Sequence, residues 1–185
     1  MRISGGFLKN RRLSSPKKGG KTRPTSEKLR QALFNIIGPQ VEDLLFLDLF
    51  AGSGSMGLEA LSRGFFHATF VEKDGLALKC LKENVKNLNL NAHVTIIPLD
   101  APLSLKKLEK KGKGFDYIYI DPPYKDIELR EEVLVYLAKS STLLRPKGRI
   151  FVEGDSKAAF PPLEGLLLEK KRRIGSSLLL QFKQP

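Results

Sequence analysis

An alternation of apolar strand-like runs with amphipathic helical stretches is the feature that most restricts how this chain can fold. Strand-like runs occupy residues 44–49, 67–72, 93–100, 115–120 and 148–154, and helical spacing fills residues 55–64, 75–90, 102–111 and 127–139. Strands that alternate with helices form a mostly parallel sheet with helices on both faces. The chain is therefore predicted to be α/β, with a doubly wound sheet.

Both ends of the chain depart from this alternation. Residues 166–183 read as two strands joined by Gly175-Ser176, so one antiparallel strand is expected in the sheet or beside it. The glycine-rich start predicts a small hairpin arm, and Thr25 is the expected N-cap of a first helix. The chain is therefore predicted to consist of an arm, 1–24, and a single globular domain, 25–185.

Positive charge is concentrated in the arm. The formal net charge is +12, and the first 30 residues hold ten basic side chains and one acid. Such clustering is expected where a protein binds a phosphate backbone. A second basic run, 170–173, lies near the C-terminus. The predicted RNA-binding residues are those of the arm, namely Arg11, Arg12, Lys17, Lys18, Lys21 and Arg23.

Few side chains are available for metal or thiol chemistry. Cys80 is the only cysteine, and His67 and His93 are the only histidines, so no internal disulfide, zinc site or histidine-based triad is expected. The first residues lack an apolar signal core, and no apolar run approaches the ~18 residues of a membrane span. A cytoplasmic protein that binds neither metal nor membrane is expected, as a monomer.

A glycine-rich loop follows the first strand of the alternation. Gly52, Gly54 and Gly57 form the pattern G-x-G-x-x-G between a strand and a helix, which is the context of a nucleotide-binding fingerprint. Glu72 lies 20 residues after Gly52, at the end of the next strand. A carboxylate there can accept hydrogen bonds from both ribose hydroxyls, so the loop and this acid predict a nucleotide-like cofactor.

Two further carboxylates favour S-adenosylmethionine over NAD. Asp48 ends the first strand, where it would repel a pyrophosphate but attract the α-ammonium and sulfonium groups of S-adenosylmethionine. Asp100 ends the third strand and could accept a hydrogen bond from the adenine amino group, although it would also suit a helix start. The predicted cofactor-binding residues are Asp48, Phe50, Ala51, Gly52, Ser53, Gly54, Glu72, Lys73, Asp100 and Ala101.

The fourth strand ends in the motif Asp121-Pro122-Pro123-Tyr124. Two prolines stop a central strand because neither has the N–H that the sheet needs. Asp121 and the Pro122 carbonyl would accept hydrogen bonds from the two N–H groups of an exocyclic base amine. This arrangement would aim the nitrogen lone pair at a methyl group. Tyr124 would stack on the base, which must leave its stack or already lie in a loop. These four residues are the predicted catalytic residues.

The combination of DLFAGSGSMG, VEKD and IDPPY resembles class I S-adenosylmethionine-dependent methyltransferases that modify exocyclic amines of bases. More narrowly, the chain from RISGGFLKNRRL through TRPTSEKLRQALFNIIG to RRIGSS is similar to the bacterial family of 16S ribosomal RNA guanine-N2 methyltransferases, of the RsmD type. The glycine loop and the proline motif are shared by many methyltransferases. The arm joined to the R-P-T…L-F-N helix is much more specific.

The resemblance implies a seven-stranded, Rossmann-like methyltransferase sheet with a small N-terminal hairpin. It implies S-adenosylmethionine as the methyl donor and a guanine N2 in small-subunit ribosomal RNA as the acceptor, within the subunit or an assembly intermediate. By position, Asp48 and 51–54 would hold the methionine part of the cofactor, Glu72 the ribose and Asp100 the adenine. Residues 121–124 would hold the target base.

The chain departs from the family pattern at four positions. Asn10 stands where glycine is frequent, and asparagine tolerates the left-handed turn that the hairpin would need. Gln31 replaces a frequent glutamate, which removes one charge. Tyr124 replaces the phenylalanine of some members, and either ring stacks. Ile174 replaces a frequent tyrosine, so it is given no role.

The residues alone leave three alternatives open. A DNA or RNA adenine-N6 methyltransferase would use the same motif, although the chain shows no separate domain for reading a DNA sequence. An NAD-dependent oxidoreductase would need a hydride-transfer site, and neither histidine has an evident partner. A non-catalytic RNA-binding module would have no need for intact Asp48, Glu72, Asp121 and Tyr124.

Overall fold

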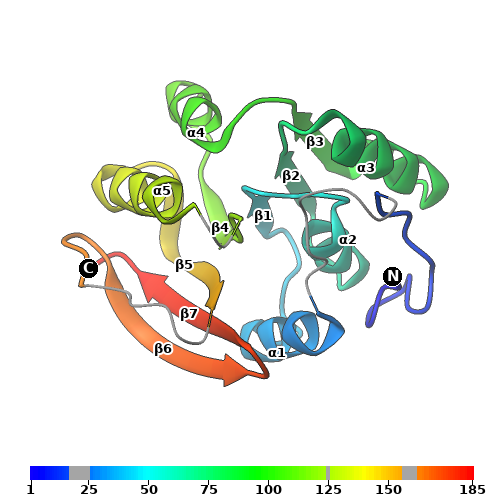
Figure 1. Ribbon diagram of the computed structural model, residues 1–185, viewed down its shortest axis with the longest axis horizontal. Coiled ribbons are helices and arrows are strands. Elements are labelled where there is room, and N and C mark those ends of the chain that lie inside the picture. Colours follow the sequence, from blue (N-terminus) through cyan, green and yellow to red (C-terminus); the bar gives the residue numbers. More distant parts are fainter. Residues whose placement is uncertain (17–25, 124–125, 156–161) are drawn as a thin grey trace.

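A seven-stranded sheet forms the centre of the molecule (Figure 1). The computed structural model describes residues 1–16, 26–123, 126–155 and 162–185. In chain order the elements are α1 (Glu27–Ile37), β1 (Leu45–Asp48), α2 (Ser55–Ser62), β2 (His67–Val71), α3 (Gly75–Asn87), η1 (Asn91–His93), β3 (Val94–Ile97), α4 (Ala101–Lys110), β4 (Phe115–Ile120), α5 (Ile127–Lys139), β5 (Leu144–Asp155), β6 (Leu167–Ile174) and β7 (Ser177–Lys183).

The sheet order is β3-β2-β1-β4-β5-β7-β6. Strands β1 to β5 pair in parallel, and β7 is antiparallel to both of its neighbours, β5 and β6. This confirms the predicted doubly wound α/β sheet with one antiparallel strand. No helix in the described parts of the chain is both long and apolar enough to cross a membrane.

Two apolar clusters lie on opposite faces of the sheet. Successive strand residues point to opposite faces, so Phe46 belongs to the first cluster and Leu47 to the second. Helices α1, α2 and α3 contribute to the first cluster, and α4 and α5 to the second. Because helices cover both faces, the central strands are apolar on both sides, which explains why their sequences read as continuous apolar runs.

Several element boundaries differ from those predicted, including the end of the third strand, which stops at Ile97 instead of residue 100. Ser26, not Thr25, is the N-cap of α1, and its Oγ accepts a hydrogen bond from Leu29 N at 3.2 Å; Thr25 lies outside the described residues. Helix α3 ends at Asn87, before the left-handed Asn89. Strand β5 begins at Leu144 because a register shift against β4 absorbs the extra residues that follow it.

The described part of the arm, residues 1–16, forms a hairpin that packs against the sheet domain. Arg2 and Arg12 form an antiparallel bridge, and Asn10 has a φ of 70°, as the predicted left-handed turn requires. Ile3 and Leu13 are buried in the first cluster. The arm is therefore part of the hydrophobic core on that face.

A buried ionic group holds the arm on α2. Both carboxylate oxygens of Glu59 accept hydrogen bonds from Ser4, from its N at 2.7 Å and from its Oγ at 2.8 Å. Arg63 Nε lies 2.9 Å from the same carboxylate, and Arg30 Nε lies 3.6 Å from it. Glu59 and Arg30 are fully buried, so this pairing offsets the cost of removing both charges from water.

Candidate active site

The C-terminal ends of β3, β2, β1 and β4 meet at one edge of the sheet. Backbone hydrogen bonds continue past the strands: Ala51 N donates to Val71 O at 3.0 Å, and Glu72 N donates to Ile97 O at 3.2 Å. Ligands of doubly wound sheets bind at this edge. The four acids predicted to form the site follow these strands in turn, namely Asp100, Glu72, Asp48 and Asp121.

The glycine loop has the tight geometry that its sequence predicts. Gly54 is the N-cap of α2 with a left-handed φ of 86°. A side chain at Gly57 would overlap the ring of Phe70, so glycine here lets α2 pack closely on β2. The first turn of α2 therefore lies directly over the end of β1.

Asp48 is a buried carboxylate at the base of this loop. It is 1% exposed, and its Oδ2 accepts a hydrogen bond from Gly57 N at 3.2 Å. Its Oδ1 has no hydrogen-bond partner among the described residues. Burial raises the pKa of Asp48 to about 7, against the Gly57 hydrogen bond, and the nearby charge of Glu72 raises it further. Asp48 therefore offers an acceptor atom that a cationic group could use.

Glu72 ties the glycine loop to the end of β2. Its Oε2 accepts a hydrogen bond from Gly52 N at 2.7 Å. Its Oε1 accepts from Lys73 N at 2.8 Å and from Asp74 N at 2.7 Å. The Glu72 carboxylate therefore fixes the glycine loop to the chain that follows β2.

Asn84 joins the same loop to the arm, a role that the sequence analysis missed. Its Nδ2 donates to Ser53 O and to Ser14 O, both at 2.9 Å, and its Oδ1 accepts from Ser14 N at 2.7 Å. It occupies a position of α3 that belongs to the buried stripe containing Leu81 and Val85. A polar residue in an apolar stripe was the available signal.

The remaining predicted cofactor residues lie at the same edge in different environments. Asp100 is the N-cap of α4, and its Oδ1 accepts a hydrogen bond from Leu103 N at 2.9 Å. The helix-start alternative for Asp100 therefore holds, with Ala101 buried as the first helical residue. Phe50 is half-buried and packs against the second cluster, whereas Lys73 is exposed.

Strand β4 ends at Ile120, directly before the proline motif. Asp121 is half-buried and Pro122 is buried. The carbonyl of Pro123 accepts a hydrogen bond from Asp126 N at 2.8 Å, which closes the turn before α5. Tyr124 lies outside the described residues. A hollow of about 40 Å³ adjoins the motif, lined by Pro122, Pro123, Asp126, Ile127, Arg130, Glu153, Gly154 and Asp155.

A buried polar network supports β4 just before the motif. Tyr119 OH donates to Glu153 Oε2 at 2.6 Å, and Ser177 Oγ donates to Glu153 Oε1 at 2.9 Å. Burial, with the charges of Asp121 and Glu153, raises the pKa of Tyr119 well above its usual value. The tyrosine therefore stays a neutral donor and fixes β4 against β5 and β7.

The described basic residues of the arm are at the surface. Arg11 and Arg12 are exposed, and Arg11 Nη2 donates to Asn87 O at 3.0 Å. The second basic run, 170–173, lies along β6 at one edge of the sheet and is exposed throughout. The other predicted RNA-binding residues lie outside the described residues, namely Lys17, Lys18, Lys21 and Arg23.

Comparison with known proteins matches the whole length of the chain. A family model described as conserved hypothetical protein 95 matches residues 1–183. The putative rRNA methyltransferase YlbH of Bacillus subtilis is 38% identical, over 100% of this chain and 99% of that protein. The ribosomal RNA small subunit methyltransferase D of Escherichia coli K12 is 33% identical, over 87% of this chain and 78% of that protein.

Solved structures show the same arrangement. A putative methyltransferase, yhhF from Escherichia coli, superposes with a TM-score of 0.84 at 28% identity, covering 100% of this chain and 97% of that one. A hypothetical protein of Thermus thermophilus, TTHA0928, gives a TM-score of 0.82 at 31% identity, covering 98% of each chain. The similarity extends over the arm as well as the sheet.

Proposed function

The chain belongs to the conserved hypothetical protein 95 family, and from this we infer that it is an S-adenosylmethionine-dependent methyltransferase of ribosomal RNA. We propose further that the acceptor is the N2 amine of a guanine in small-subunit RNA. The observation that carries this proposal is the adjacency of β1 and β4, which brings the Asp121 motif beside Asp48 and the glycine loop.

The position of Asp48 suits the charged ammonium group of the proposed cofactor. Asp48 Oδ1 is a buried acceptor without a partner among the described residues, and a cationic ammonium group would satisfy it. Glu72 already accepts three backbone hydrogen bonds, and a carboxylate has about four lone-pair sites, which leaves room for a ribose hydroxyl. Asp100 would reach the adenine with the oxygen that does not cap α4.

The chemistry of the acceptor follows from the Asp121 motif. S-adenosylmethionine supplies an electrophilic methyl group on its sulfonium. Asp121 and the Pro122 carbonyl would accept hydrogen bonds from the two N–H groups of the amine. These two hydrogen bonds would favour a pyramidal nitrogen and direct its lone pair at the methyl group. Positioning of this kind lowers the barrier without a strong base. Asp121 would then take the proton that the methylated amine loses, and Tyr124 would stack on the base.

An RNA substrate would give the basic surface of the arm a role in binding. Arg11 and Arg12, with the basic residues that follow them in the arm, would contact phosphates around the target base. We propose that the target lies within the small subunit or an assembly intermediate, and that the protein acts as a cytoplasmic monomer.

Methyl transfer to defined substrates tests this function. The protein would be incubated with S-adenosylmethionine and unmodified small subunits, free small-subunit RNA or DNA, and the product base mapped by mass spectrometry. N2-methylguanine in the RNA is the expected product. N6-methyladenine in any substrate would instead establish the adenine alternative, and methylation of DNA alone would exclude the RNA substrate.

Replacement of Asp121 tests the assigned chemistry. Because Asp121→Ala removes an acceptor for the reacting amine, methyl transfer should fall by roughly 10²–10³-fold. Affinity for S-adenosylhomocysteine, measured by calorimetry, should stay near the wild-type value. Asp116→Ala, at the opposite end of β4, is the matched control and should keep its turnover. Unchanged turnover in Asp121→Ala would remove this residue from the mechanism.

A further inference from the structure

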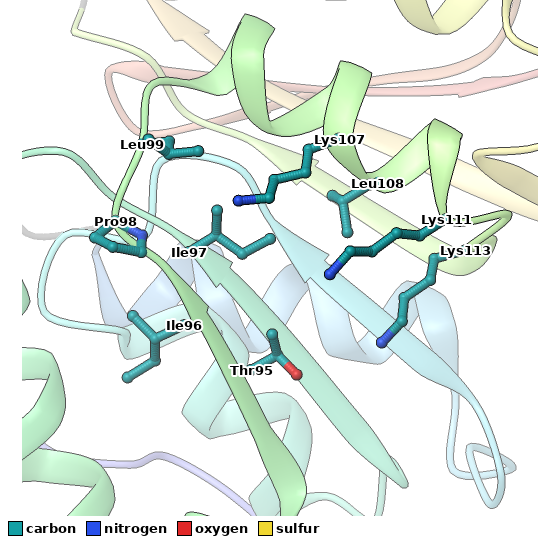
Figure 2. Close-up of a pocket in the computed structure, with 9 residues that line it drawn as sticks. All are labelled: Thr95, Ile96, Ile97, Pro98, Leu99, Lys107, Leu108, Lys111 and Lys113. Atoms are coloured by element: carbon teal, nitrogen blue, oxygen red, sulfur yellow. The ribbon is translucent and has the colours of Figure 1, made fainter.

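The sheet ends on one side in a strand that has a hollow along its free edge. Among the described strands, β3 pairs only with β2. A hollow of about 300 Å³ lies between this strand and α4 (Figure 2). It is lined by Thr95, Ile96, Ile97, Pro98, Leu99, Lys107, Leu108, Lys111 and Lys113, and is called here the β3–α4 groove.

Three lysines form one wall of the β3–α4 groove. Lys107 and Lys111 are four residues apart, and Lys113 follows in the turn after α4. Figure 2 shows these side chains extending from α4 and the following turn toward β3. All three are exposed, and no ion pair with any of them occurs among the described residues. No acidic residue lines the groove.

The floor of the groove is apolar. Ile97, Pro98 and Leu108 contribute it, beside the three lysine side chains, whereas the side chain of Ile96 packs against the first cluster on the other face of the sheet. An apolar floor beside a row of cations suits a polymer that alternates anionic groups with flat, weakly polar rings. Nucleic acid strands have this chemistry, since lysines bind their phosphates while sugars and bases pack on apolar surface.

We propose that the β3–α4 groove binds the phosphodiester backbone of the ribosomal RNA substrate. This inference rests on the proposed function and adds a contact on the far side of the cofactor site from the Asp121 motif. Pro98 and Leu99 directly precede Asp100, so the groove begins where the proposed adenine site ends. RNA leaving the active site along this edge would meet Lys107, Lys111 and Lys113 in turn.

Two structural roles for these lysines make different predictions. Lysines near a helix C-terminus complement its dipole, and lysines beside an edge strand prevent its pairing with another copy. The first role concerns stability, and the second concerns association of copies. Neither affects the affinity for RNA.

A pair of double variants separates these roles. Lys107→Gln/Lys111→Gln removes two charges from the groove wall. Lys106→Gln/Lys110→Gln removes two charges from the same helix at the same spacing, and neither of these exposed residues lines the groove. Both variants change the long-range field almost equally, so a difference between them reports contact. Binding to a small-subunit RNA fragment would be measured over a range of salt concentrations.

The groove variant should bind RNA roughly tenfold more weakly than the control variant. The slope of log affinity against log salt should be shallower by about 1 for each lost phosphate contact. The KM for RNA should rise while kcat and the affinity for S-adenosylhomocysteine stay constant. Equal affinities in the two variants would overturn the proposal, as would aggregation of the groove variant without loss of RNA affinity. Failure of the wild-type protein to bind small-subunit RNA would overturn the proposed function and the groove together.

Discussion

At the scale of single residues, Asp48 shows how a side chain proposed to bind the cofactor lowers the stability of the fold. A buried carboxylate with one unpartnered oxygen among the described residues is costly, because the charged form has lost its water and the backbone hydrogen bonds from Gly57 and Phe50 compensate only in part. Its pKa is raised from 3.8 to about 7 in the folded protein. The unfolded chain therefore ionises Asp48 first, so this residue lowers the free energy of unfolding as pH rises from about 4 to 7.

Asp48→Asn should remove this pH-dependent penalty. Below about pH 3 the wild type and the variant should differ little on this account, because Asp48 is then largely protonated in both the folded and the unfolded wild-type chain. Above pH 7 the variant should be more stable, by at most on the order of 4 kcal/mol. Urea denaturation at pH 5, 6, 7 and 8 measures the difference. The same variant should bind S-adenosylhomocysteine more weakly, and a stability difference independent of pH would contradict the assigned cause.

The sequence predicts those site residues whose positions follow from a strand end. Asp48, Glu72 and Asp121 could be placed because each follows an apolar run that ends at the same sheet edge. Glu153 could not be placed in this way. Asn84 stands out as a polar residue in an apolar stripe, but its partners could not be predicted from the sequence. Glu153 bonds Tyr119 and Ser177, which are 34 and 24 residues away. Such partners are known only once the order of strands is known.

At the scale of elements, the contact between the arm and α2 depends on a glycine. Gly6 has a φ of 76°, and a side chain there would overlap the backbone of Ser62 in α2. Phe7 N donates to Ser62 O at 2.8 Å at the same point. The double glycine of the arm therefore lets two backbones approach closely.

Gly6→Ala should strain the contact between the arm and α2 and so destabilise the fold that both share. The left-handed φ and the steric overlap together should lower the free energy of unfolding by roughly 3 kcal/mol. Gly112→Ala is the matched control, because Gly112 also has a positive φ, 61°, but open space around its Cα. Limited proteolysis with trypsin should cut Gly6→Ala near Arg11 and Arg12 faster than either the wild type or the control. Equal cutting rates in all three proteins would show that this contact does not hold the arm.

Element types are predictable from periodicity, whereas their ends depend on local competition. Ser26 and Thr25 are both good N-cap residues, and serine is only slightly preferred over threonine at this position, so the residue types alone separate them weakly. The start of β5 could not be predicted either. Pro146 argues against a strand, but the register shift between β4 and β5 accommodates it.

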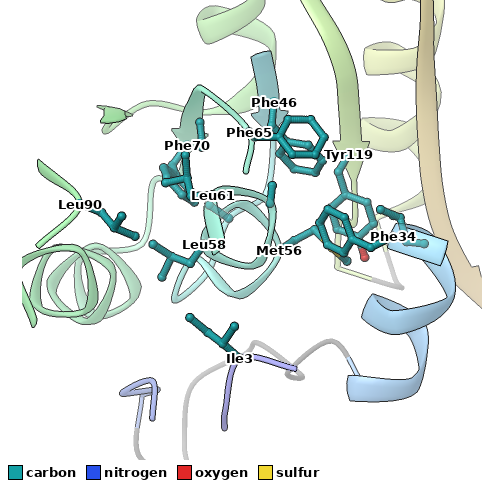
Figure 3. Close-up of a cluster of buried hydrophobic side chains, with 14 of the residues drawn as sticks. Ile3, Phe34, Phe46, Met56, Leu58, Leu61, Phe65, Phe70, Leu90 and Tyr119 are labelled. Atoms are coloured by element: carbon teal, nitrogen blue, oxygen red, sulfur yellow. The ribbon is translucent and has the colours of Figure 1, made fainter. Parts of the chain in front are cut away.

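At the scale of the whole molecule, the arm and the sheet share one core. Ile3 is 1% exposed and belongs to the cluster that contains residues of α1, α2 and β2. Figure 3 shows its side chain near Leu58 of α2, at the margin of this cluster. We therefore propose that arm and domain unfold together, although their sequences differ so much in composition.

Ile3→Ala tests this cooperativity. The substitution leaves a cavity under the arm and should lower the free energy of unfolding by about 2–5 kcal/mol. Urea unfolding followed by far-ultraviolet circular dichroism and by tyrosine fluorescence should give one coincident transition in both proteins. A variant that keeps the wild-type midpoint, with an early transition limited to the arm, would show that the arm is a separate unit.

The hydrogen bonds of Asn84 have a consequence for how relatives of this protein can be recombined. One amide holds Ser14 of the arm and Ser53 of the glycine loop. The arm and the glycine loop are thus joined through one side chain, although the sequence suggests an appendage and a separate globular domain. Because the atoms that Asn84 bonds in Ser14 and Ser53 belong to the main chain, a chimera that takes its arm from one relative and its body from another keeps this link if the body carries asparagine at position 84.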